Sequence, residues 1–132
     1  MAPGNRDLVQ QLYDEFNETL ELPRRLLDAE LEWWPPADEP DNGVRRGAEE
    51  AIVYVREWAR SFKDYRCEVL ELVESGDRVA ASLTLHGRIR ESDTAELTLP
   101  LTQVWRIRDG RIVEVREYRT LAEAVAEMAP KS

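Results

Sequence analysis

The sequence has very few of the residues that form crosslinks or hold metals. Cys67 is the only cysteine and His86 the only histidine among 132 residues, so an intrachain disulfide is impossible. The acids between residues 30 and 41 have no ordered spacing with that histidine, and we therefore expect no metal site. No glycine-rich phosphate loop follows any expected strand, which predicts a protein without a cofactor.

Long apolar runs and an excess of positive charge are also missing. No segment approaches membrane-spanning length, and the stretch from Met1 to Arg6 lacks the apolar region of a secretory signal. Together with the single cysteine, these absences predict a cytoplasmic protein. The 18 Lys and Arg residues are outnumbered by 27 Asp and Glu, and the formal net charge of −9 argues against nucleic acids and anionic membranes as partners.

The residues that are present suffice for one globular domain. Hydrophobic residues make up 42% of the chain and charged residues 34%, a balance typical of a folded protein. A chain of 132 residues is long enough to bury a core of its own but too short for two such cores. We therefore expect a single domain over residues 1–132.

Apolar residues recur with a helical period in the first half of the chain and with a period of two in the second. We expect a helix from its N-cap Asn5 to about Asn17, a short helix over Leu22–Leu27, an extended segment over Glu30–Trp34, a loop to Gly43 and a helix after Gly47. Strands are expected at about Tyr65–Glu74, Arg78–Arg88, Ala95–Ile107 and Arg111–Tyr118, followed by a helix over Leu121–Met128. This order predicts an α+β fold, with helices covering one face of an antiparallel sheet.

Alternation along the strands predicts which face of the sheet is covered. Leu83, Leu101 and Val115 share one parity with most other apolar residues of their strands, whereas the residues Ser82, Thr84 and Arg106 have the opposite parity. Apart from Arg111 at a hairpin, two strongly polar residues of the last three strands share the parity of the covered face: Gln103 and Glu117. These two are the first candidates for a functional site.

Several short segments resemble one protein family when taken together. They are Leu12-Tyr13 ahead of Phe16-Asn17, the run from Asp28 to Pro35, Arg46-Gly47, the run from Ser75 to Val79, the run from Val104 to Glu114, and Ala122-Glu123-Ala124. In this combination the chain resembles the SnoaL-like branch of the nuclear transport factor 2-like superfamily, which includes ketosteroid isomerases. The resemblance implies a cone-shaped, strongly bent sheet closed on its concave face by N-terminal helices, with a pocket inside and often a dimer. Its members include cyclases, isomerases, dehydratases, epoxide hydrolases and non-catalytic binders, so fold alone decides no function.

The positions that carry isomerase chemistry in that family differ here. The resemblance places Trp34, just before Pro35, at the position of the base, and Gln103 at the position of the second acid, with a tyrosine near Leu12 or Tyr13. Neither Trp nor Gln exchanges a proton near neutral pH, which argues against the isomerase mechanism. His86, the residue that a dehydratase would need, has the parity of the uncovered face. Glu117 and Arg119 match two parts of an epoxide-hydrolase site, but a third part is missing.

Each candidate has a structural and a functional interpretation. Gln103 either bonds to Tyr13 or a helix backbone, or donates to a ligand oxygen. Glu117 either forms a salt bridge with Arg119 or a helix residue, or is a buried acid–base group whose pKa is raised by an apolar environment. Aromatic candidates for the pocket wall are Tyr13, Trp34, Trp58 and Trp105.

Two functions from different classes remain open. In the first, the pocket binds a small apolar, cyclic molecule, and any catalysis is acid–base chemistry in which Glu117 moves the proton while Gln103 and Tyr13 hold an oxygen. In the second, the cone is filled by its own aromatic residues, and a non-catalytic module dimerises through the outer face of the sheet, which carries Thr98, Pro100, Thr102, Val104 and Tyr118. A void of roughly 300 Å³ or more favours the first.

Overall fold

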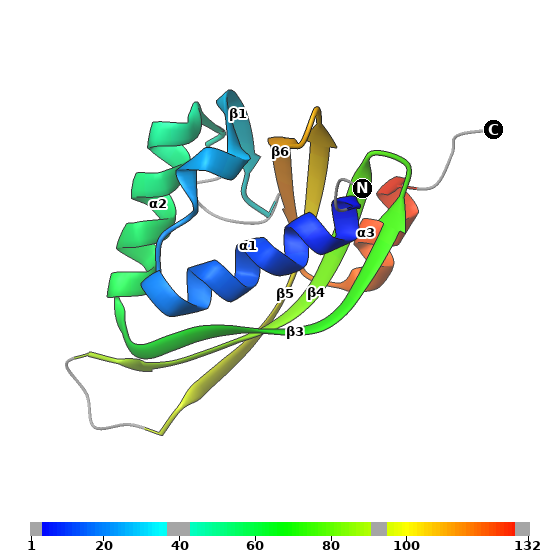
Figure 1. Ribbon diagram of the computed structural model, residues 1–132. Helices are drawn as coiled ribbons and strands as arrows, with labels where there is room; N and C mark the ends of the chain where they lie inside the picture. The colour runs from blue at the N-terminus through cyan, green and yellow to red at the C-terminus, as the bar shows by residue number, and fades with distance from the viewer. Residues whose placement is uncertain (1–3, 37–42, 91–94, 129–132) are drawn as a thin grey trace.

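A computed structural model of the chain describes residues 4–36, 43–90 and 95–128, and Figure 1 shows its fold. The elements are α1 (Asn5–Thr19), a 3₁₀ turn η1 (Arg24–Leu26), β1 (Leu27–Trp34), β2 (Arg45–Arg46), α2 (Ala48–Arg60), β3 (Phe62–Ser75), β4 (Arg78–Ile89), β5 (Leu97–Arg108), β6 (Arg111–Tyr118) and α3 (Leu121–Met128). The α+β fold predicted from the sequence is confirmed, and β6 and α3 have the predicted bounds. Part of the loop expected between Pro35 and Gly43 lies outside the described residues.

The six strands form one sheet in the order β2-β1-β6-β5-β4-β3. The four long strands β3 to β6 form the predicted antiparallel meander, whereas β1 runs antiparallel to β2 and parallel to β6. The short helix expected over Leu22–Leu27 is only the turn η1, and β1 begins at Leu27, where the side chain is already buried. In Figure 1 strands β3 to β5 curve, and α1 and α2 lie on the concave side.

The main core fills the space between these helices and the sheet. The buried stripe of α1 consists of Leu8, Val9, Leu12, Tyr13 and Phe16, and that of α2 of Ala48, Ala51, Ile52, Val55 and Ala59. On the sheet, Leu83 is 1% exposed and Val115 is fully buried, as the alternation predicts, while Leu101 is half-buried against the same core. The parity that selects Gln103 and Glu117 is therefore confirmed.

A glycine marks the start of α2. Gly47 has a backbone φ of 94°, a conformation that costs a residue with a side chain far more than it costs glycine. Its N–H donates to the carbonyl oxygen of Leu31 at 2.6 Å, which attaches the start of α2 to β1. This turn holds α2 over the strand that carries the two adjacent tryptophans.

The opposite face of the sheet is partly covered, which corrects a prediction. Ala80, Val104 and Ala124 form a second, smaller core, against which Tyr118 of β6 packs together with Leu121 and Met128 of α3. Thr102 on the same face is only 2% exposed. Of the five residues expected to form a dimer surface, Thr98 and Pro100 are exposed, whereas Thr102 and Val104 are buried and Tyr118 is half-buried.

Candidate functional site

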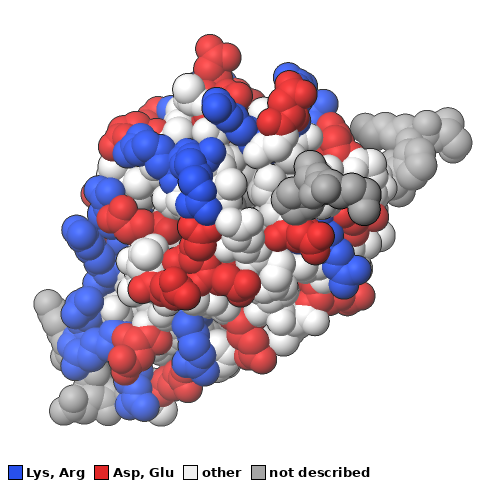
Figure 2. Space-filling model, in the orientation of Figure 1, with Lys and Arg blue, Asp and Glu red and all other residues white. Residues whose placement is uncertain are grey.

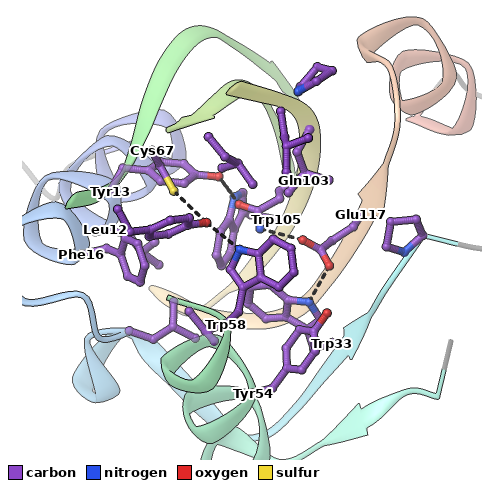
Figure 3. Close-up of a pocket in the computed structure, with 18 of the residues that line it drawn as sticks. Leu12, Tyr13, Phe16, Trp33, Tyr54, Trp58, Cys67, Gln103, Trp105 and Glu117 are labelled. Atoms are coloured by element: carbon purple, nitrogen blue, oxygen red, sulfur yellow. Dashed lines mark hydrogen bonds between the residues drawn. The ribbon is translucent and has the colours of Figure 1, made fainter. Parts of the chain in front are cut away.

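A cavity of about 290 Å³ lies between α1, α2 and the concave face of the sheet (Figure 3). Its wall consists mainly of aromatic and aliphatic side chains: Leu12, Tyr13, Phe16, Leu22, Trp33, Pro36, Tyr54, Val55, Trp58, Tyr65, Leu85, Leu99, Pro100, Leu101 and Trp105. Cys67, Gln103, Glu117 and Arg119 complete it. The volume is close to the lower end of the range of about 300–1,000 Å³ typical of ligand sites.

Five side chains of this wall form one continuous chain of hydrogen bonds (Figure 3). The indole N–H of Trp105 donates to the Tyr13 hydroxyl at 2.8 Å, and that hydroxyl donates to Oε1 of Gln103 at 2.6 Å. The Gln103 amide N–H donates to Oε2 of Glu117 at 3.0 Å, and the Trp33 indole N–H donates to Oε1 of the same carboxylate at 3.0 Å. We call these five residues the Gln103 network.

The direction of every bond in the Gln103 network follows from its two ends. An indole can only donate and a carboxylate can only accept, so Trp105 must donate into the chain and Glu117 must receive from Gln103. The Gln103 amide nitrogen therefore faces Glu117, its oxygen faces Tyr13, and the Tyr13 hydrogen is used in that bond. This is the structural interpretation of Gln103 that the sequence left open, a bond to Tyr13.

Aromatic packing holds the Gln103 network in place. The rings of Trp33 and Trp105 meet edge to face, with centroids 5.7 Å apart at 90°, and Trp105 meets Tyr13 at 5.8 Å and 86°. Such edge-to-face pairs add about 0.5–1.5 kcal/mol each beyond the area they bury. Burial also raises the pKa of Tyr13 well above its usual value, only partly offset by the bond from Trp105, so its hydroxyl stays protonated.

The tryptophan that lines the cavity is Trp33, and the prediction that Trp34 does so is wrong. Trp33 pairs with the buried Val115 of β6 and is 2% exposed, whereas Trp34 pairs with Arg116. Since neighbouring side chains of a strand point to opposite faces, only one of the two can face the cavity. Trp34 instead lies under the guanidinium of Arg116, whose central carbon is 4.3 Å from the ring centroid.

A second polar cluster in the wall involves a residue that the sequence did not single out. The Trp58 indole N–H donates to the Tyr65 hydroxyl at 2.9 Å, and the thiol of Cys67 lies 3.9 Å from the same oxygen. Burial raises the pKa of Cys67 to about 12 and also raises that of Tyr65, so both groups stay protonated at neutral pH. We call Tyr65, Trp58 and Cys67 the Tyr65 cluster. Tyr65 shares its parity in β3 with Cys67, which is the one sequence signal that pointed to it.

The remaining candidates lie at the cavity opening or outside it. Arg119 lines the cavity and is exposed, and Trp58 lines it while 41% exposed, so both lie where it meets solvent. His86 lies on the other face, as predicted, where its Nε2 is 2.8 Å from Oε1 of Glu68 and its Nδ1 is 3.3 Å from Oε1 of Glu96. The other predicted residues, Tyr13, Gln103, Trp105 and Glu117, are brought together in the cavity wall.

Neither a metal-binding cluster nor a membrane-spanning helix is found in the described part of the chain. Within residues 4–36, 43–90 and 95–128, no three His, Cys, Asp or Glu side chains gather closely enough to hold a metal ion. No helix among those residues is long and apolar enough to cross a bilayer. On the face across which α1 runs, acidic and basic side chains are interspersed, and Figure 2 shows no continuous basic surface there.

Comparisons with known proteins agree with this architecture. Residues 9–115 match the family model described as a SnoaL-like domain. A loop-truncation variant of IdmH is 25% identical, with a TM-score of 0.71 over 93% of this chain and 98% of that one. Bal32a, from a soil-derived mobile gene cassette, is 20% identical with a TM-score of 0.71, covering 92% of this chain and 93% of its own. TerC co-crystallized with polyporic acid is 18% identical with a TM-score of 0.69, covering 92% and 95%. No curated protein matches the chain.

Proposed function

Because the chain belongs to the SnoaL-like domain family, we propose that its cavity binds a small, largely apolar cyclic molecule and that Glu117 transfers a proton within that site. The observation that carries this proposal is a carboxylate in the wall of a 290 Å³ cavity whose other lining residues are mostly apolar. Glu117 is only 9% exposed, and such a group is a candidate acid or base wherever a ligand can reach it. The co-crystal of TerC with polyporic acid shows that one protein of this fold was obtained with a small molecule.

The wall favours a flat or cyclic ligand over a flexible polar one. Burying apolar ligand surface against these rings stabilises the complex by about 25 cal/mol per Å². The net charge of −9 repels anionic ligands at long range, so a neutral molecule is favoured. Among the described residues of the wall Arg119, at the opening, is the one basic side chain, and we propose that it contacts the polar edge of the ligand there.

The proposed chemistry is a reversible proton transfer. Glu117 removes a proton from a carbon next to a ligand carbonyl, the C–H electron pair moves into the new C=C bond, and the carbonyl oxygen takes the negative charge. Return of the proton to another carbon gives isomerisation. Return to the same carbon, after the carboxyl has exchanged its proton with water, gives hydrogen exchange with solvent. A positioned general base contributes typically 10²–10⁴-fold to such a step.

The test uses 1-indanone, a neutral two-ring ketone whose protons next to the carbonyl exchange slowly in water. The wild-type protein should accelerate their replacement by deuterium, measured by proton NMR in D₂O. Glu117→Gln should lose at least about 100-fold of that acceleration, since the amide is no base. The matched control is Glu71→Gln, the same change on an exposed residue of β3, which should exchange 1-indanone at the wild-type rate.

The competing function is the non-catalytic module. It requires that 1-indanone neither binds nor exchanges, and equal rates in wild type and Glu117→Gln would remove the acid–base part of the proposal. The expectation from the sequence that an apolar environment raises the pKa of Glu117 stays a prediction, and carboxyl-carbon NMR titration tests it. The homodimer and the cytoplasmic location stay predictions of the sequence.

A further inference from the structure

A ligand oxygen held in the cavity needs a hydrogen-bond donor. The Tyr13 hydroxyl, which the sequence predicts for that task, already donates its hydrogen within the protein. The Tyr13 hydroxyl accepts a hydrogen bond from the Trp105 indole and donates its only hydrogen to Oε1 of Gln103. To donate to a ligand it would have to leave that oxygen without its hydrogen-bond donor in a buried site, which is unfavourable. The role assigned to Tyr13 from the sequence is therefore unfavourable in this arrangement.

The hydroxyl of Tyr65 is in the opposite situation. A hydroxyl has one hydrogen to donate and two positions at which to accept. The Trp58 indole can only donate, so Tyr65 accepts in that bond, and the protonated thiol of Cys67, 3.9 Å away, is only a weak donor and a weak acceptor. No nitrogen or oxygen among the residues that the structure describes accepts the Tyr65 hydrogen. Tyr65 is buried and lines the cavity.

The surroundings of Tyr65 prepare it to donate. Its ring stacks on Phe62 with centroids 5.5 Å apart at 25° and meets Phe16 edge to face at 6.2 Å, which restricts the ring to one position. A hydroxyl that accepts a hydrogen bond becomes a stronger donor, because the bonds polarise one another in a medium of low dielectric. In Figure 3 the dashed lines from Trp58 and Cys67 end on the same oxygen.

We infer that Tyr65, rather than Tyr13, is the specificity-determining residue that donates a hydrogen bond to an acceptor oxygen of the ligand. The inference rests on the proposed ligand-binding function of the cavity. The assignment of Tyr65 restricts the proposed ligand to a neutral cyclic molecule. This molecule has a carbonyl or ether oxygen directed at Tyr65 and a proton-bearing atom directed at Glu117. The Gln103 amide donates one of its two N–H groups to Glu117, and the second can assist without replacing Tyr65.

The test compares two ligands of the same shape, 1-indanone and indane, which differ by the carbonyl oxygen. Binding is followed by NMR of the four tryptophan indole N–H signals, of which that of Trp58 reports on Tyr65 directly. In Tyr65→Phe the ratio of 1-indanone affinity to indane affinity should fall about five- to tenfold, the effect of one hydrogen bond. In Tyr13→Phe that ratio should stay within about twofold of wild type. Indane affinity serves as the internal check that each variant keeps its cavity.

Each result has a defined meaning. If the ratio of 1-indanone affinity to indane affinity is unchanged in Tyr65→Phe, or falls only in Tyr13→Phe, the assignment of Tyr65 is overturned and the proposed ligand site remains. Failure of both compounds to shift any indole signal of the wild-type protein overturns the proposed function, and this inference with it. A fall of the ratio in Tyr65→Phe alone, with indane bound as in wild type, supports the assignment.

Discussion

The two polar groups in the cavity wall differ in how completely their hydrogens are used. In the Gln103 network, Tyr13 donates to Gln103, Gln103 to Glu117, and the indoles of Trp105 and Trp33 close the two ends. In the Tyr65 cluster, Trp58 and Cys67 both approach one oxygen, and no nitrogen or oxygen among the described residues accepts the hydrogen of that oxygen. The comparison teaches that burial of a polar residue beside a cavity does not by itself identify a donor for a ligand.

The two groups also differ in their contact with solvent. Trp33 and Trp105 at the ends of the Gln103 network are fully enclosed, whereas Trp58 of the Tyr65 cluster is 41% exposed. A group of the Gln103 network that loses its hydrogen-bond partner cannot bond to water instead, whereas the Trp58 indole of the Tyr65 cluster can. We therefore expect the network to contribute mainly to stability and to the placement of Glu117, and the cluster mainly to ligand binding.

The largest expected effect comes from breaking the centre of the Gln103 network. Gln103→Leu removes the acceptor of the Tyr13 hydrogen and the amide donor to Oε2 of Glu117, and we expect the free energy of unfolding to fall by about 2–4 kcal/mol. Urea denaturation monitored by circular dichroism measures it. Tyr65→Phe serves as the comparison and should cost about 1 kcal/mol, because water can replace the lost partner of Trp58. Equal costs would contradict the difference drawn between the two groups.

A somewhat smaller effect is expected at the end of the network. Trp33→Phe removes the indole donor to Glu117 and part of a fully enclosed side chain, and should lower the free energy of unfolding by about 2–3 kcal/mol. The adjacent Trp34→Phe is the matched control. It weakens only a cation–π contact with Arg116 on a half-buried ring, worth about 0.5–1 kcal/mol. The reverse order of the two costs would restore the original prediction that Trp34 faces the cavity.

Alkaline pH should act on the Tyr65 cluster. Burial raises the pKa of Cys67 to about 12 in the folded chain, whereas an unfolded cysteine titrates near 8.5–9. A group with a raised folded pKa stabilises the fold fully below its unfolded pKa, and that contribution is lost as pH rises toward the folded value. We expect the free energy of unfolding to fall by up to about 1.4 kcal/mol per pH unit above pH 9 from this thiol.

The measurement is urea denaturation at a series of pH values from 8 to 11. Cys67→Ala should reduce the slope above pH 9, and Arg111→Ala, at an exposed hairpin residue, should leave it unchanged. At pH 8 the native thiol should react with a disulfide reagent far more slowly than the unfolded one, since the thiolate is the reactive form. Rapid labelling of the native protein would show that Cys67 is less buried than the cluster requires.

The smallest effect concerns assembly. The sequence predicts a dimer through the outer face of the sheet, but α3 occupies part of that face, leaving Thr98 and Pro100 exposed. A dimer through that face would have to use this remaining surface. Light scattering after size-exclusion chromatography should then return about twice the chain mass of 15.3 kDa. A species of 15.3 kDa at micromolar concentration would show that both polar groups function within one chain.

The face of the sheet on which each side chain of the long hairpins lies was predictable, because it follows from the alternation along a single strand. Alternation in β4, β5 and β6 placed Leu83, Val115, Gln103 and Glu117 on the concave face without knowledge of any partner strand. The helix α3 was also predictable over its full length, but not the face it covers, because that depends on a packing contact with Ala80 and Val104 far away in sequence.

The orientation of the two tryptophans depended on long-range pairing. In β1 the register with β6 shifts between Leu27 and Glu32, so the alternation that starts at Leu27 does not extend unbroken to Trp33. Pairing with Val115, 82 positions away in the chain, determines which tryptophan faces inward. Tyr65 was missed for a similar reason, since its importance comes from Trp58 on another element and from the hydrogen that this contact leaves uncommitted.

The most direct test of the central claim is a crystal structure of the protein with 1-indanone. The account predicts the two rings inside the cavity between Trp105 and Trp58, the ketone oxygen about 2.7–2.8 Å from the Tyr65 hydroxyl, and the adjacent carbon facing the Glu117 carboxylate. Such a complex would place the donor and the base on opposite sides of one carbonyl group. Density for 1-indanone only outside the cavity, or a ketone oxygen bonded to Tyr13 with its link to Gln103 broken, would contradict it.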